Sequence, residues 1–133
     1  MSKFALRKLR AVEGRIPFSM LEVDGVCPFE EFCRQIKRDG NLAKQLITAM
    51  ARMNQVANLQ RLPVEKFRDI TAAKEVVKEF EIKTGDLRIY LIKEDEHIVI
   101  LGGKKNTQSD DIKRFRSLKK RYLQSKRERY VDA

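Results

Sequence analysis

The feature that most constrains this fold is an alternation of apolar and polar side chains, with a period of two residues, between residues 76 and 101. The alternation comes in three short runs, separated by the turn sequences Thr84-Gly85-Asp86 and Glu94-Asp95-Glu96. A period of two is typical of strands that bury one face, and short polar turns join antiparallel neighbours. The stretch therefore predicts a three-stranded antiparallel meander.

The first hairpin of this meander has a predictable register. With Gly85-Asp86 as its two turn residues, Lys83 lies opposite Arg88, and Glu81 lies opposite Tyr90. Because side chains of a strand alternate between its faces, one face is then aliphatic and suited to contact with helices. The other face carries Glu79, Glu81, Lys83, Arg88 and Tyr90.

The second hairpin extends the same arrangement. A two-residue turn at Glu94-Asp95 would pair Leu91 with Ile98 and keep the aliphatic side chains on one face. By the same parity, Lys105 projects on the side of Arg88. Arginine can fork onto two phosphate oxygens and lysine adds a point charge, so this concave polar face is suited to a phosphodiester. The alternative is a solvated face whose acidic and basic side chains form cross-strand ion pairs.

The other segments complete an α+β fold. Residues 18–23 are predicted to form a strand, and apolar residues at helical spacing predict an antiparallel pair of helices over 28–36 and 41–58. A last helix begins at Thr107. Residues 1–14 are expected to be a short basic helix or a frayed tail. The expected architecture is an N-terminal strand and a helical hairpin packed on a three- to four-stranded antiparallel sheet, followed by a basic C-terminal helix.

The charge is concentrated at the two ends of the chain. The net charge is +10, and residues 104–129 carry eleven basic and three acidic side chains. Residues 1–15 carry five basic side chains and one acidic one, so a nearly neutral middle remains. We divide the chain into a basic extension (1–14), one domain (15–125) and a basic tail (126–133). This pattern favours a polyanionic partner, most often a nucleic acid, although a solvated basic helix without a partner would look similar.

Several classes of protein are excluded. The chain has no apolar run of the roughly 18 residues that a membrane span requires, and no apolar stretch of a signal peptide near its start. Two cysteines, Cys27 and Cys33, and the single histidine His97 cannot supply the set of ligands of a zinc site. We therefore expect a cytoplasmic protein with no metal, no cofactor and no membrane contact.

Three motifs follow one another with defined spacing. They are Glu79-Phe-Glu-Ile-Lys83, the hairpin Gly85-Asp-Leu-Arg-Ile-Tyr90, and Ile98-Val-Ile-Leu-Gly-Gly-Lys-Lys-Asn-Thr-Gln108 ahead of the last helix. In this order they resemble the RelE/ParE toxin superfamily, especially its HigB-like branch. The resemblance is good over residues 76–123. Over residues 18–58 only the order strand, helix, helix agrees.

The resemblance implies a RelE-like fold and the toxin of a type II toxin-antitoxin system. Such a toxin is a ribosome-dependent mRNA endonuclease, in which the 2′-hydroxyl attacks the adjacent phosphate without a metal ion. By this resemblance Arg88 and Lys105 stabilise charge on the phosphate, and Lys83 or Glu81 is the general base. RNA contacts are expected from Lys104, Tyr90, Lys113, Arg114, Arg116 and Lys120. The implied partners are an antitoxin, the ribosome and mRNA.

The sequence departs from the RelE pattern at two places. Glu79 and Glu81 stand where the RelE type carries lysines, and the tyrosine that the RelE type places early in the last helix is missing. The alternatives are therefore a ParE-like toxin that inhibits DNA gyrase by contact, a non-catalytic module that binds nucleic acid, and an inactive relic of the fold.

Overall fold

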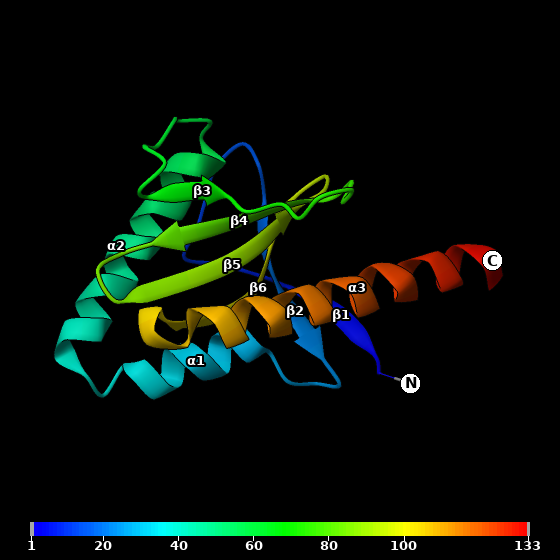
Figure 1. Ribbon diagram of the computed structural model, residues 1–133, viewed down its shortest axis with the longest axis horizontal. Helices are drawn as coiled ribbons and strands as arrows, with labels where there is room; N and C mark the ends of the chain where they lie inside the picture. Colours follow the sequence, from blue (N-terminus) through cyan, green and yellow to red (C-terminus); the bar gives the residue numbers. More distant parts are fainter. Residues whose placement is uncertain (1, 133) are drawn as a thin grey trace.

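A mixed β-sheet lies between two helical layers in the computed structural model, which describes residues 2–132 (Figure 1). Across these residues the sheet has six strands in the order β1-β2-β6-β5-β4-β3. All neighbours pair antiparallel except β2 and β6, which pair parallel. The strands are β1 (Phe4–Lys8), β2 (Phe18–Val23), β3 (Phe67–Asp69), β4 (Lys78–Lys83), β5 (Leu87–Lys93) and β6 (His97–Lys104). The helices are α1 (Pro28–Ile36), α2 (Gly40–Ala57), the short 3-10 helix η1 (Lys105–Thr107) and α3 (Gln108–Asp132).

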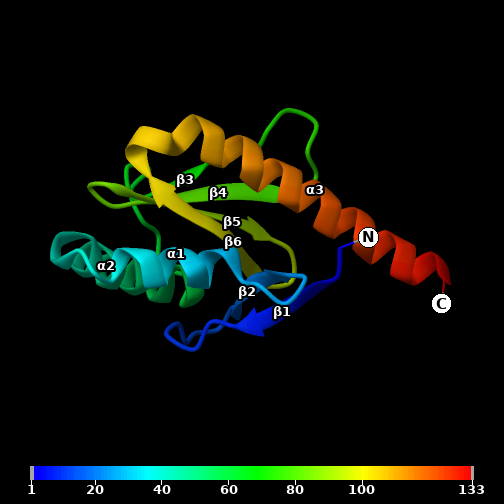
Figure 2. The same ribbon diagram turned by 90° about the horizontal axis from the view of Figure 1, so that it is seen from below.

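The helices divide between the two faces of the sheet. Helices α1 and α2 lie on one face, and α3 lies across the other (Figure 2). Phe29 and Met53 of the helix pair pack against Ile89 on the first face, whereas Phe115 of α3 packs with Ile92 on the second. Strands β5 and β6 are consequently buried on both faces along nearly their whole length.

The expected helical hairpin is confirmed, and local sequence explains where each helix begins. Pro28 occupies the first turn of α1, where its missing N–H and fixed φ cost nothing. Asp39 caps α2, because its carboxylate Oδ1 accepts hydrogen bonds from the backbone N–H groups of Asn41 (2.9 Å) and Leu42 (3.1 Å). The two helices therefore meet at a short corner over residues 37–39.

The expected sheet of three to four antiparallel strands is too small. The expectation of a helix or frayed tail before residue 15 is wrong, because β1 pairs with β2 over its full length. Phe4 is buried beneath α3, and Leu9 and Val12 enter the core of the helix pair. Basic side chains at Arg7 and Lys8 are typical of an edge strand, which they protect from further pairing.

The predicted register is right for the first hairpin and wrong for the second. Lys83 lies opposite Arg88 as expected. The second turn spans three residues instead of two, so Lys93 pairs with His97, and Leu91 lies opposite Val99 rather than Ile98. An irregularity at Tyr90/Leu91 shifts the pairing again toward the end of β6. Both faces of these strands are aliphatic, so the sequence pattern does not distinguish the two registers.

Candidate functional site

Three polar side chains of β4 and β5 meet on the α3 side of the sheet, and we call them the buried cluster: Glu81, Arg88 and Tyr90. Glu81 lies directly opposite Tyr90, and Arg88 precedes Tyr90 by two residues on the same face. Glu81 and Tyr90 are fully buried, and only 8% of Arg88 is exposed. The open polar face expected at these positions is therefore wrong, because α3 covers it; Tyr90 stacks on Phe115 with ring centroids 5.6 Å apart.

The hydrogen bonds of the buried cluster are incomplete. Gln108 Nε2, at the first residue of α3, donates to Glu81 Oε2 over 2.6 Å. Arg88 Nη1 donates to the backbone oxygen of Thr84 over 2.8 Å. Within the described part of the chain, Glu81 Oε1, Arg88 Nε and Tyr90 Oη are buried without a hydrogen-bond partner. Each such atom costs about 1–3 kcal/mol where it stays without a partner, so the hydrogen bonds of these three side chains require an explanation.

The charges around Tyr90 fix its protonation. Burial raises the pKa of the Tyr90 phenol, and the negative charges of Glu81 and Asp111 raise that pKa further, against a smaller opposite effect of Arg88. The phenol is thus neutral at physiological pH. It can act as a proton donor toward a bound group, beside a carboxylate and a guanidinium.

Two glycines at the end of β6 allow helices to approach from both faces. Gly103 lies opposite Arg88, and a Cβ there would collide with the carboxylate of Asp111 from α3. A Cβ on Gly102 would collide with the ring of Phe32 from α1. The Gly-Gly pair therefore permits α3 to close over the buried cluster and α1 to close on the opposite face.

The two predicted catalytic lysines lie apart from each other. Lys83 ends β4 opposite Arg88 and is half-buried, so it belongs to the edge of the buried cluster. Lys105 is exposed and lies in η1, beyond the end of β6. Side chains alternate between the two faces of a sheet only within a strand. Because β6 ends at Lys104, this alternation does not place Lys105 beside Arg88. Instead, Lys105 lines a cavity together with Asn41 and Asp86, on the side of the helix pair.

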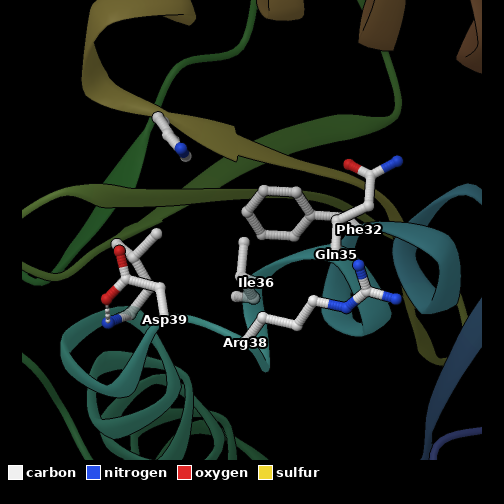
Figure 3. A pocket seen from close by; sticks show the side chains of 7 residues that line it. Phe32, Gln35, Ile36, Arg38 and Asp39 are labelled. Atoms are coloured by element: carbon white, nitrogen blue, oxygen red, sulfur yellow. Dashed lines mark hydrogen bonds between the residues drawn. The ribbon is translucent and has the colours of Figure 1, made fainter.

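This cavity adjoins a second one, and we call the two together the corner groove, between the α1–α2 corner and the junction of β6 with η1. Figure 3 shows the second cavity, with Phe32, Gln35 and Arg38 among its lining. One cavity of about 490 Å³ adjoins another of about 360 Å³, and both are lined by Asp39, Leu42 and Lys104. Lys104, Lys105, Arg38, Asp39, Asp86, Gln35, Asn41, Asn106, Phe32, Ile36 and Leu42 line the groove. Among these, sequence analysis singled out only the two lysines, because residues 32–42 come from a distant segment without a motif.

The predicted RNA-binding residues of α3 divide into two groups. Lys113, Arg114 and Lys120 are exposed, on the surface of the helix away from the sheet. Arg116 instead donates to the Glu79 carboxylate (3.2 Å) and to the backbone oxygen of Ile70 (2.7 Å). The first group is accessible to a polyanion, whereas Arg116 is already used within the fold.

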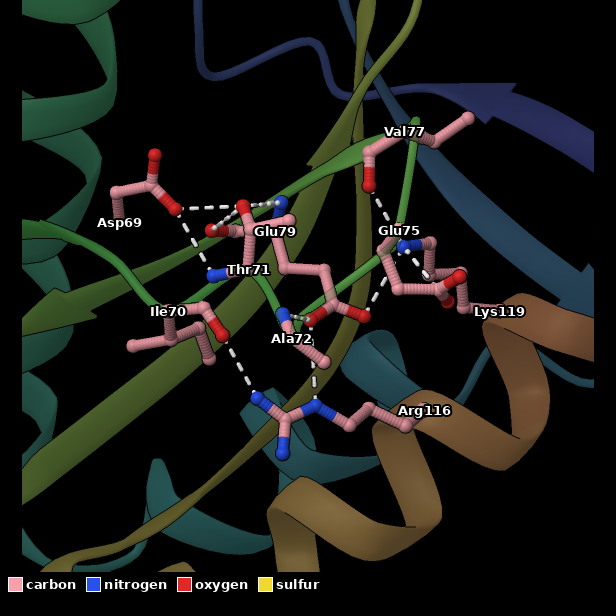
Figure 4. A network of polar contacts seen from close by, with 9 residues as sticks. All are labelled: Asp69, Ile70, Thr71, Ala72, Glu75, Val77, Glu79, Arg116 and Lys119. Atoms are coloured by element: carbon pink, nitrogen blue, oxygen red, sulfur yellow. Dashed lines mark hydrogen bonds and ion pairs between the residues drawn. The ribbon is translucent and has the colours of Figure 1, made fainter.

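Arg116 belongs to a network around the fully buried carboxylate of Glu79 (Figure 4). Lys119 Nζ, only 1% exposed, lies 3.0 Å from Glu79 Oε2 and also donates to the backbone oxygen of Val77. The backbone N–H of Ala72 donates to Glu79 Oε1 over 2.9 Å. These contacts fasten α3 to β4 and to the loop before it. Glu79 on β4, expected on an open face, is thus an anchor for α3.

Other kinds of site find little support in the described residues. No group of three or more His, Cys, Asp or Glu side chains there could hold a metal ion. Burial raises the pKa of the Cys33 thiol to about 11, so this thiol is protonated at neutral pH. None of the helices between residues 2 and 132 has both the length and the apolar character of a membrane span.

Comparison with known proteins gives no relative: no family model, no curated protein and no solved structure matches this chain.

Proposed function

We propose that this chain is an RNA-cleaving toxin of the RelE/ParE type, acting on mRNA at the ribosome. The observation that carries the proposal is the buried cluster, in which a guanidinium, a carboxylate and a neutral phenol share one face and retain unfilled hydrogen-bonding atoms. An arginine beside proton-transferring groups suits metal-free cleavage of a phosphodiester. The motifs around Arg88 and Lys105, and the α+β arrangement, also support this proposal.

The proposed reaction moves two protons and exchanges one bond to phosphorus. The 2′-oxygen of a ribose forms a bond to the adjacent phosphorus while its proton passes to a base, Glu81 or Lys83. The bond from phosphorus to the 5′-oxygen breaks, and that oxygen takes a proton, for which the neutral Tyr90 phenol is a donor on the same face. The products are a 2′,3′-cyclic phosphate and a free 5′-hydroxyl. Arg88 would stabilise the charge on the oxygens of the reacting phosphate, and Lys105, which lines the cavity on the side of the helix pair, would hold a neighbouring phosphate of the same RNA.

Because the buried cluster is covered by α3, the proposed enzyme has to open before it can bind its substrate. Glu81 and Tyr90 have no exposed surface while Gln108 closes over them, so substrate reaches these groups only after the first turn of α3 shifts. A free toxin with a closed site fits an enzyme that cleaves only on the ribosome. The same proposal includes an antitoxin as partner and the cytoplasm as the place of action.

The test is tightly induced expression of the wild type beside the variants Lys105→Ala and Arg88→Ala/Lys105→Ala. Growth is scored, and new mRNA 5′ ends are mapped. We expect arrest with cuts inside reading frames, reduced in the single variant and lost in the double one. Lys105 is exposed, so its variant tests the site without disturbing the fold, and circular dichroism checks folding of the double variant.

A second candidate is a non-catalytic module that binds nucleic acid. The exposed cations Lys113, Arg114 and Lys120 favour it, since they need no access to the buried cluster. RNA binding by folded wild type without arrest and without strand cleavage would select this candidate. Arrest without cuts would instead indicate a target other than mRNA, such as DNA gyrase.

A further inference from the structure

We propose that the corner groove binds one nucleotide of a single-stranded RNA, with Arg38, Lys104 and Lys105 contacting its phosphate and the next phosphate along the strand. Its role as a subsite beside the cut rests on the proposed function, whereas RNA binding in the groove does not. The two adjoining cavities, of about 490 and 360 Å³, are within the size range of small-ligand sites.

The cations of the groove are unpaired. Arg38 follows α1, and Lys104 and Lys105 follow one another at the end of β6, so two distant segments bring three positive charges to one groove. All three residues are exposed, and within the described part of the chain no ion pair or side-chain hydrogen bond engages them. Unpaired guanidinium and ammonium groups around a concave surface are a typical arrangement for phosphate.

The two carboxylates of the groove are already engaged. Asp39 Oδ1 accepts from the backbone N–H groups that begin α2, and Asp86 Oδ2 accepts from Gln45 Nε2 over 2.9 Å. Both acids therefore have a structural role at a corner and a turn. Their presence weakens the attraction for an anion, but the three cations outnumber them.

The remaining lining suits a base. Phe32 packs closely over Gly102, where any larger residue would collide with its ring, and the ring stays half-buried. The exposed amides of Gln35, Asn41 and Asn106 offer both donors and acceptors to a base edge. A base can enter such a groove only when it is not paired, which favours single-stranded RNA over a duplex.

The β4–β5 turn connects the corner groove with the buried cluster. On one side of this turn, Arg88 Nη1 donates to the backbone oxygens of Thr84 and Gly85. On the other side, Asp86 lines the groove, and its backbone oxygen accepts from the N–H of Lys105. A strand of RNA that crosses this turn would therefore reach both places with neighbouring nucleotides.

The test measures binding apart from cleavage. A fluorescent twelve-nucleotide RNA with 2′-O-methyl riboses cannot be cut by 2′-hydroxyl attack, and its anisotropy reports binding to the full chain. We compare the wild type with Arg38→Ala/Lys104→Ala and with the matched control Arg61→Ala/Lys66→Ala, which removes one arginine and one lysine at exposed positions away from the groove. The same proteins are then scored for mRNA cuts in cells.

The groove variant should bind the RNA roughly tenfold more weakly than the wild type, while the control binds within a factor of about two. The slope of log K against log salt should fall by about 0.7 for each phosphate that the groove variant no longer neutralises. If wild type and groove variant bind the RNA with equal affinity and equal salt dependence, the proposed nucleotide site in the corner groove is wrong, even if mRNA is cut in cells. If the groove variant loses RNA binding and the wild type makes no cuts in cells, the corner groove binds RNA but the proposed endonuclease activity is wrong.

Discussion

The buried hydroxyl of Tyr90 is expected to lower the stability of the fold and, in the proposed reaction, to contribute to activity. Its hydroxyl lies between Glu81 and the covering helix without a hydrogen-bond partner in the described structure, and burial has raised its pKa. A hydroxyl in this state costs stability, since it has given up its hydrogen bonds to water and gained none. Its retention in the core is explained if it transfers a proton during the reaction.

The variant Tyr90→Phe keeps the ring that stacks on Phe115 and removes only the hydroxyl. We expect its free energy of unfolding, measured in urea, to equal or exceed that of the wild type by up to about 1 kcal/mol. If Tyr90 donates the proton to the leaving oxygen, ribosome-dependent cleavage should fall by about 10²-fold. Unchanged cleavage in this variant would remove Tyr90 from the reaction.

His97 gives the fold a dependence on pH. The side chain is 4% exposed and stacks on Phe18 at 4.6 Å between centroids, and Nδ1 has no partner among the described residues. Burial, with a smaller contribution from the positive charge of Lys93, lowers its pKa from 6.5 to about 4. Between these two values the unfolded chain binds a proton that the folded chain does not, so the folded state loses stability as pH falls.

The loss should reach roughly 3 kcal/mol between pH 7 and pH 4, since each pKa unit corresponds to about 1.4 kcal/mol. The variant His97→Phe preserves a ring against Phe18 and cannot titrate. Urea unfolding of both proteins at a series of pH values isolates the contribution of the histidine, because other groups titrate in both. Parallel pH profiles would mean that His97 is protonated in the folded state as easily as in the unfolded one.

At the scale of whole elements, short-range sequence signals explain most of what could be predicted. The turn at Gly85-Asp86 and the Pro28 start of α1 depend on a few neighbouring residues, and both were predicted correctly. Strand β1 and the covering of the sheet by α3 depend on contacts across the chain. Phe4 has its partner Tyr122 more than a hundred residues away, and no local pattern reveals such a pair.

The site follows the same rule. Arg88 was placed correctly relative to Lys83 and Tyr90 because one hairpin holds all three. Lys119 lies in the last helix, which the sequence predicted only as basic, yet it is the buried partner of Glu79. A lysine among the many basic side chains of α3 gives no signal of burial. Its partner lies 40 residues earlier, on another element.

The contact between Glu79 and Lys119 should dominate the attachment of α3. Without Lys119, the Glu79 carboxylate keeps only its contacts with Arg116 and the Ala72 N–H. Without Glu79, the Lys119 ammonium keeps only Glu75 and the backbone oxygen of Val77. Because each substitution removes one buried hydrogen bond between charged groups, Glu79→Leu and Lys119→Met should each lower the free energy of unfolding by about 1.5–3 kcal/mol. The double variant Glu79→Leu/Lys119→Met should cost less than either single one, because no charge of the pair remains buried. Urea unfolding of the four proteins gives this coupling directly. Additive losses would show that the two side chains act independently.

At the scale of the whole molecule, the two basic ends of the chain come together. The start of strand β1 lies beside the second half of α3 (Figures 1 and 2), where Phe4 meets Tyr122. Arg121 of α3 contacts the N-terminal segment, since its guanidinium lies 5.7 Å from the Phe4 ring centroid and donates to Ser2 Oγ. The N-terminal residues and α3, which are both rich in basic side chains, are thus adjacent at this place. A polyanion bound there would contact both ends of the chain at once.

The contribution of β1 to stability can be measured by replacing two of its side chains, one at a time, with alanine. Phe4 is 6% exposed beneath α3, whereas Leu6 is 38% exposed. Phe4→Ala should lower the free energy of unfolding by about 3–5 kcal/mol, because it opens a cavity against Tyr122, and Leu6→Ala should lower it by less than about 1.5 kcal/mol. Urea unfolding reports both, and hydrogen exchange should show faster opening of the second half of α3 in the Phe4 variant only. If both variants unfold like the wild type, these side chains of β1 contribute nothing to stability, and the contacts of α3 with β4, β5 and β6 hold it without them.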